Sequence, residues 1–183
     1  NNTAGSSTPT GVRANTTAGF SIIKYTGTGA SASWGHGLGK EPELIITKDL
    51  DGTNFWNVYH KDVGYSEYLR LDDTAGAATP GAARISATSI STFTTGSAAG
   101  QTNALNTDYI AYCWAPVEGY SKFGSYEGNS SNDGPFVELG FRPAVLLIKR
   151  YDSTGNWIIV DSKRNPFNVV DNPLLPNLGD GDY

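Results

Sequence analysis

The chain contains two segments of closely similar sequence, and this internal repeat limits the folds that it can adopt. LGKEPELIITKDLDGTNFWNVYHKD begins at Leu38, and LGFRPAVLLIKRYDSTGNWIIVDSK begins 101 positions later, at Leu139. The same offset aligns five further pairs of identical residues: Gly39/Gly140, Pro42/Pro143, Lys48/Lys149, Thr53/Thr154 and Trp56/Trp157. A period of about 100 residues is too long for a solenoid and is typical of a whole small domain.

The repeat also predicts the domain organisation. GFSIIKYTGTG at Gly19 matches GYSKFGSYEGN at Gly119. We therefore expect residues 1–18 to be a linker or the end of a preceding unit, residues 19–118 a first unit, and residues 119–183 a partial second unit. The second unit has no counterpart of TDYIAYCWAP, so we expect it to be truncated or to borrow a strand from elsewhere. The absence of methionine indicates a processed product or a piece of a longer protein.

Composition and local pattern indicate an all-β fold. Hydrophobic residues make up 38% of the chain, charged residues only 17%, and there are 22 glycines. Short runs of β-branched and aromatic residues alternate with Gly, Pro, Asn and Asp clusters, which is typical of antiparallel strands joined by turns. We expect an antiparallel β-sandwich or jelly roll. The predicted strands are Phe20–Tyr25, Leu44–Lys48, Phe55–His60, Tyr68–Leu71, Ser89–Thr94, Tyr109–Trp114, Lys122–Tyr126, Val145–Arg150 and Trp157–Asp161, with TGVRAN as a possible earlier strand.

The charge pattern argues against two classes of partner. The net charge is −5 and the 13 basic residues are scattered, so the sequence predicts no nucleic-acid partner. No apolar stretch approaches the roughly 20 residues that span a bilayer, and no basic amphipathic helix is present, so we expect no membrane partner. The single cysteine, Cys113, lies in an apolar strand and is expected to be buried.

No residue pattern indicates catalysis, and only a weak one indicates a metal. DLDGTN places Asp49 and Asp51 as in the start of a calcium loop, but its glycine is misplaced and a hairpin turn is the favoured interpretation. No serine lies in a nucleophile elbow, and His36 and His60 have no histidine at the aligned positions of the second unit. We therefore predict no enzyme activity and no cofactor, with calcium as the only alternative.

The aromatic residues are the candidates for binding. The pool is Trp34, Trp56, Tyr59, Tyr65, Tyr112, Trp114, Tyr120 and Trp157. Trp34 and Tyr65 have no clear partner in the second unit and flank variable loops, so we predict that these two bind carbohydrate. Residues that recur in both units are predicted to be scaffold: Tyr25, Pro42, Trp56, Tyr126, Pro143 and Trp157.

The phrases GHGLGKEPELIITK, DYIAYCWAPVEGYSKFGSYEGN and GPFVELGFRPAVLLIKR together resemble a repeat domain of virion proteins of marine tailed phages, including cyanophages. In these phages the domain occurs in tail-fibre-like and other surface proteins. The resemblance covers nearly all of the chain from Val12 to Asp171. It implies an assembled, extracellular β module on the virion surface and gives no catalytic residues.

The sequence thus predicts a phage structural or adhesion module, in a tail fibre or surface appendage. Its loops would contact a host-surface glycan or other virion subunits, and a homo-oligomer such as a trimer is expected. Two alternatives remain open at this point: a polysaccharide depolymerase, acting as a glycoside hydrolase or lyase, and a lectin domain of an extracellular protein.

Overall fold

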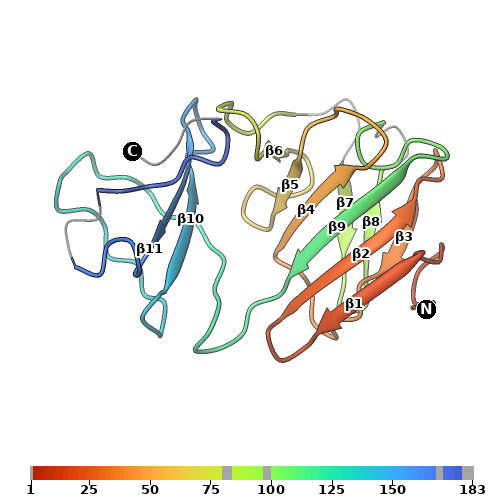
Figure 1. Cartoon of the computed structure of the whole chain (residues 1–183), viewed down its shortest axis with the longest axis horizontal. Helices are drawn as coiled ribbons and strands as arrows, with labels where there is room; N and C mark the ends of the chain where they lie inside the picture. Colours follow the sequence, from red (N-terminus) through yellow and green to blue (C-terminus); the bar gives the residue numbers. More distant parts are fainter. Residues whose placement is uncertain (1, 80–83, 97–99, 168–170, 179–183) are drawn as a thin grey trace.

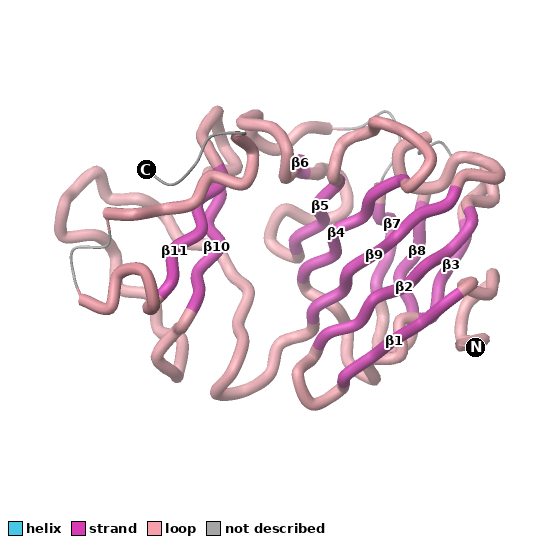
Figure 2. Tube along the Cα trace, in the orientation of Figure 1, coloured by secondary structure: helices cyan, strands magenta, loops and turns pink. Residues whose placement is uncertain are grey.

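The computed structural model describes residues 2–79, 84–96, 100–167 and 171–178. Every helix or strand assigned within these ranges is a β-strand, and the strand pairs are antiparallel (Figure 2). The predicted all-β class is therefore confirmed. No helix in the described ranges is long and apolar enough to cross a membrane.

The largest sheet has six strands in the order β1-β2-β9-β4-β5-β6 (Figure 1). Their bounds are β1 (Gly11–Asn15), β2 (Phe20–Thr26), β9 (Asp108–Trp114), β4 (Leu44–Asp49), β5 (Asn57–His60) and β6 (Leu69–Arg70). β9 lies in the middle of the sheet although it comes late in the chain. It pairs with β2 along its full length and with β4 on its other edge.

A second sheet has three strands in the order β3-β8-β7 and lies behind the first in Figure 1. These strands are β3 (Ala32–Gly35), β8 (Thr92–Thr95) and β7 (Ile85–Thr88). Side chains of both sheets meet in one core cluster, formed mainly by Ile23, Tyr25, Trp34, Ile45, Tyr59, Ile85, Phe93, Tyr109, Ala111 and Cys113. The first part of the chain is thus sandwich-like, because two antiparallel sheets share one apolar core.

The C-terminal part contains a separate hairpin, made of β10 (Val145–Lys149) and β11 (Trp157–Asp161). Beyond β11, Ile159 forms an antiparallel bridge with Leu174. We call residues 1–118 the first half and residues 119–183 the second half. Loops join them: Gly155 N donates to Thr74 O at 2.9 Å, and Ala77 N donates to Tyr151 O at 2.6 Å.

The structure corrects some of the predicted strands. Residues 122–126 form a loop, and Tyr126 is 51% exposed, whereas the aligned Tyr25 is 0% exposed. The physical reason is pairing, because β2 lies between β1 and β9 while residues 122–126 have no neighbouring strand in the described chain. Tyr126 therefore is not a core scaffold residue here. β3 and β7 are further strands, which the sequence pattern did not predict.

The other recurring residues take unequal positions. Pro42 is buried directly before β4, whereas Pro143 is half-buried before β10. Trp157 is 4% exposed, and Trp56 is half-buried beside the same cluster. This cluster, which we call the second core, contains Leu44, Ile46, Val58, Leu69 and Trp157. Both tryptophans therefore contact one apolar region on the outer face of the six-stranded sheet.

Candidate functional site

Four aromatic rings line the outer face of the six-stranded sheet, which is the face turned away from the three-stranded sheet. Phe20 comes from β2, Tyr112 and Trp114 come from β9, and Trp56 immediately precedes β5. All four are half-buried. We call this set the aromatic platform. It is the largest group of partly exposed aromatic side chains in mutual contact among the described residues.

The platform follows from strand register. Successive side chains of a strand point to opposite faces, so the buried Ala111 and Cys113 face the core while Tyr112 and Trp114 face outward. Phe20 pairs directly with Trp114 and therefore lies on the same face.

The ring geometry is that of a stacked series. The centroids of Phe20 and Trp114 lie 5.0 Å apart with 37° between the planes. Tyr112 lies 6.2 Å from Trp114 and 6.3 Å from Trp56, with interplanar angles of 27° and 22°. Offset arrangements at these distances stabilise the rings mutually. They also hold the rings in fixed positions before any ligand binds.

One end of this sheet face is covered and the other is open. Towards β4, β5 and β6, the second core buries Leu44, Ile46 and Val58 beneath Trp157, and Phe123 of the second half packs beside them. Towards β1, the sheet face has no apolar cover in the described ranges and is bordered by exposed polar residues. Register places Asn15 beside Phe20 and Arg13 beside Ile22, and both polar side chains are exposed. The platform is therefore bordered by an amide and a guanidinium group.

Two shallow hollows lie near the platform. One, of about 450 Å³, is at the β1 edge and includes Arg13, Ile22 and Lys24. Lys24 forms an ion pair with Asp108 at 2.9 Å. The other, of about 510 Å³, is where β9 leads into the second half, and its lining includes Lys40, Glu118 and Phe141. Both are open at the surface, which suits part of a long polymer better than an enclosed small molecule.

Trp34 does not lie at the surface. It is 1% exposed, stacks on Tyr25 at 4.4 Å, and donates its Nε1 hydrogen to Thr95 Oγ1 at 3.0 Å. The prediction that Trp34 binds carbohydrate is wrong, because its position on β3 points it into the core between the two sheets.

Tyr65 is 38% exposed and remains a surface residue, but it lies apart from the platform. Its ring stacks on Tyr59 at 5.2 Å, and its hydroxyl contacts Thr88 Oγ1 at 2.7 Å. Thr88 in turn donates from its hydroxyl to Glu41. Burial raises the pKa of Tyr59. This group holds the loop after β5 against β7.

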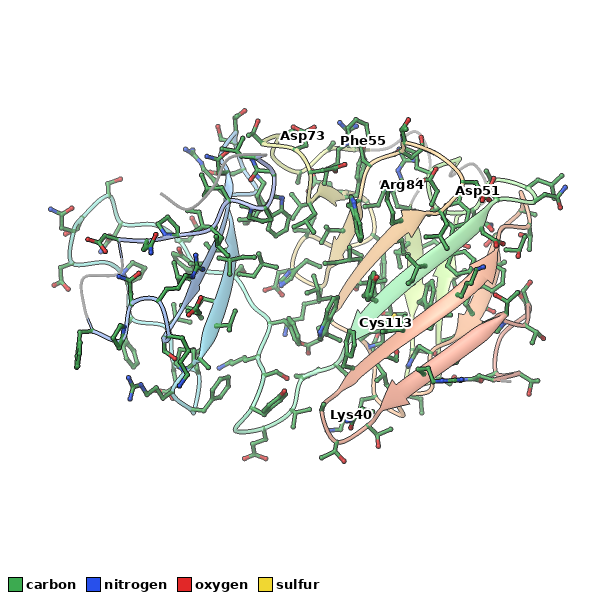
Figure 3. All side chains as sticks on the ribbon, viewed as in Figure 1. Lys40, Asp51, Phe55, Asp73, Arg84 and Cys113 are labelled. Carbon is green, nitrogen blue, oxygen red and sulfur yellow. The ribbon has the colours of Figure 1, made fainter. Side chains whose placement is uncertain are left out.

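The two aspartates of the weak calcium prediction have protein partners. Asp49 is buried, forms an ion pair with Lys48, and accepts a hydrogen bond from Asn54 Nδ2 at 2.8 Å. Asp51, at the sheet end in Figure 3, accepts from the backbone N–H of Asp108 at 2.6 Å. In the described ranges no group of three or more His, Cys, Asp or Glu side chains is placed to hold a metal ion. The arrangement is that of a hairpin turn fixed by side-chain hydrogen bonds.

His36 and Cys113 are both enclosed by the fold. His36 is fully buried, and its Nδ1 accepts from Leu38 N while its Nε2 bonds to Ser89 O at 3.1 Å. Burial lowers the pKa of His36. Cys113, in the central strand of Figure 3, is also fully buried, and burial raises its pKa. Neither group is presented to a substrate.

Trp56, Tyr112 and Trp114 belong to the predicted aromatic pool, but the sequence does not single them out as ligand-binding residues. FSIIKY carries apolar residues on both faces, and DYIAYCW is apolar after its first residue, so neither pattern shows which face is inside. The pairing of Phe20 with Trp114 joins residues far apart in the chain, and no local signal predicts it.

The comparisons with known proteins give a family. A family model described as a domain of unknown function, DUF7483, matches residues 1–183. No curated protein and no solved structure matches the chain significantly. By this match over its whole length, the chain belongs to the DUF7483 family.

Proposed function

We propose that the protein is a non-catalytic adhesion module that binds a surface glycan on the aromatic platform. The observation that supports this function is the stacked, half-exposed series of Phe20, Trp56, Tyr112 and Trp114 on one sheet face. Sugar rings present C–H groups on one face, and these groups pack well against the electron-rich faces of aromatic rings. A row of rings spaced 5.0 to 6.3 Å apart matches an extended chain of sugars better than a single one.

The border of the platform supplies polar contacts. Asn15 and Arg13 flank Phe20 and Ile22 on the same face. An amide donates to and accepts from sugar hydroxyls, and a guanidinium pairs with carboxylate or sulfate groups. We therefore expect preference for an acidic polysaccharide.

We place this module on a virion surface, as part of a tail fibre or other appendage and within a homo-oligomer such as a trimer. The sequence resemblance to marine tailed-phage proteins supports this setting. An elongated β module with an open binding face fits such a position, because many copies side by side strengthen weak glycan contacts by avidity.

We also propose that the second half is a partial second copy of the first-half unit. The register of β4 with β5 pairs Leu44 with His60, and the register of β10 with β11 pairs Val145 with Asp161, both at the 101-residue offset. Hydrogen bonds recur as well. Trp56 N donates to Asp72 Oδ1 at 3.1 Å, and Trp157 N donates to Asn177 Oδ1 at 2.8 Å.

Binding to an array of bacterial and algal surface polysaccharides tests the glycan function. We expect Tyr112→Ala and Trp114→Ala to weaken binding about fivefold or more, since each loses a stacking surface worth about 1 kcal/mol or more. Phe136→Ala is the matched control, because Phe136 is 88% exposed and outside the platform.

Three results would contradict the proposal. One is unchanged affinity in folded platform variants, and another is equal loss in Phe136→Ala. The third is release of new reducing or unsaturated sugar ends on incubation with the bound polysaccharide, which would indicate a depolymerase instead.

A further inference from the structure

One edge of β10 has no neighbouring strand in the described part of the chain. Ser162 N donates to Ala144 O at 2.9 Å, so the backbone of Ala144 faces β11. In an antiparallel strand the N–H and C=O of one residue point to the same side, and this side alternates along the strand. Val145 and Leu147 therefore direct their N–H and C=O groups away from β11. Their side chains are exposed as well, at 62% and 40%.

In the first half the matching edge is occupied by β9. The residues 101 positions before Val145 and Leu147 are Leu44 and Ile46 of β4. Leu44 pairs with Trp114 and Ile46 pairs with Tyr112, both in antiparallel register. β4 thus has a strand on each edge, β5 on one and β9 on the other. β10 has only β11.

A second segment lacks the same neighbour. In the first half, β9 also pairs with the whole of β2. Residues 120–126 align with β2 but form a loop, in which Tyr120 is 64% and Tyr126 is 51% exposed. By alignment with the first half, a strand of β9 type beside β10 would also be the neighbour that residues 120–126 lack. Two separate observations therefore indicate one missing strand of β9 type.

We propose that β10 binds an extended peptide strand, antiparallel to itself and supplied by a partner polypeptide with the chemistry of β9. This chemistry is an apolar side chain at nearly every position, as in the run YIAYCW of β9. The chain's own β9 cannot fill the role, since it is fixed between β2 and β4. The interaction is strand addition, in which backbone hydrogen bonds give affinity and alternate side chains give register. This inference rests on the proposal that the second half is a partial copy of the first-half unit, and it does not rest on glycan binding.

The test uses the full chain and a synthetic peptide with the sequence of residues 107–115, carrying Cys113→Ser for solubility and redox stability. Amide hydrogen exchange is followed by NMR with and without the peptide. We expect exchange at Val145 and Leu147 to slow about tenfold or more, because each N–H gains a backbone partner. We expect residues 120–126 to gain protection as well.

Two N-methylated peptides give a matched control. In β9 the N–H of Tyr112 points towards β4 and that of Ala111 towards β2, since Leu50 N donates to Asp108 O and Ala115 N donates to Gly19 O. Methylation at the Tyr112 position should therefore weaken binding to β10 about tenfold, the effect of one lost backbone hydrogen bond. Methylation at the Ala111 position should leave the protection of Val145 and Leu147 intact and lower only that of residues 120–126.

Several outcomes would overturn the proposal. Equal protection of Val145 and Leu147 by both methylated peptides would indicate unspecific apolar adhesion. Protection of Val145 and Leu147 in the protein alone, together with concentration-dependent dimerisation, would assign the edge to a second copy of the chain. The peptide is also tested after it has been joined to the chain through a flexible linker following Tyr183. If neither the free nor the joined peptide protects the amides of Val145 and Leu147, the edge accepts no strand. Failure on the glycan array leaves the inference untouched.

Discussion

Trp34 and Trp56 show how strand register decides whether a large side chain belongs to the core or to a surface. Trp34 points between the two sheets and is 1% exposed, whereas Trp56 lies half-buried on the outer face. We expect Trp34→Ala to lower the free energy of unfolding by about 3–5 kcal/mol, as for other large-to-small core changes. Trp56→Ala should cost less than half of that. Urea unfolding measures both, and equal costs would contradict the assignment of faces.

His36 predicts a pH dependence of stability. Burial lowers its pKa in the folded state, and its bond to Ser89 O only partly offsets this. The unfolded chain, with an ordinary histidine pKa of about 6.5, therefore binds a proton more readily. The contribution of neutral, buried His36 to the free energy of unfolding is therefore fully present above pH 6.5 and is lost as the pH drops below this value.

The measurement for His36 is the free energy of unfolding between pH 8 and pH 5. His36→Asn keeps an acceptor for Leu38 N and removes the titrating group, so its stability should fall less steeply over this range. Burial lowers the pKa of His60 as well, so His60 adds the same pH dependence of stability to the original chain and to His36→Asn. A slope that is unchanged in His36→Asn would contradict the prediction.

At the scale of the element, the turn between β1 and β2 depends on one glycine. Gly19 has a φ of +63°, and a Cβ placed on it would lie 2.3 Å from Ala115 O. Gly119, its aligned partner, has a φ of +72° but has nothing within 4 Å of such a Cβ. Gly19→Ala should therefore cost about 3 kcal/mol or more, since strain in φ adds to a backbone clash, and Gly119→Ala about 1 kcal/mol. Equal effects in thermal unfolding would show that φ alone sets the cost.

The sequence predicts the strands whose pattern is strong and misses those that depend on distant partners. β2, β4, β9, β10 and β11 lie within one or two residues of the predicted bounds. β3 (ASWG) and β7 (ISAT) are short and polar on one side, so their local signal is weak. Residues 122–126 have a strand-like sequence but no neighbour to pair with among the residues that the structure describes, and an isolated strand is not stable. The candidate site was harder to predict, because the platform exists only once β2 and β9 are side by side.

At the scale of the whole molecule, Trp157 connects the two halves. Its ring is buried in the second core against Leu44 and Val58, and its Nε1 donates to Arg70 O at 2.6 Å. Arg70 is itself fixed, because its guanidinium lies 4.0 Å above the Phe55 ring and pairs with Asp73 at 3.1 Å. Phe55 and Asp73 both lie at the upper edge of the first half in Figure 3. One side chain thus joins the hairpin to a rigid part of the sheet.

We therefore expect Trp157→Ala to release the hairpin without unfolding the sandwich-like half. Removing a buried tryptophan costs about 3–5 kcal/mol, so amide exchange in β10 and β11 should accelerate at least about a hundredfold. Exchange in β2 and β9 should change little, because their core lies between the two sheets and does not contain Trp157. Trp56→Ala is the matched control, since it removes the half-buried tryptophan of the same region. If amide exchange accelerated equally in β2, β9, β10 and β11, the two halves would unfold as one cooperative unit. Trp157 would then be a general core residue and not a link between the halves.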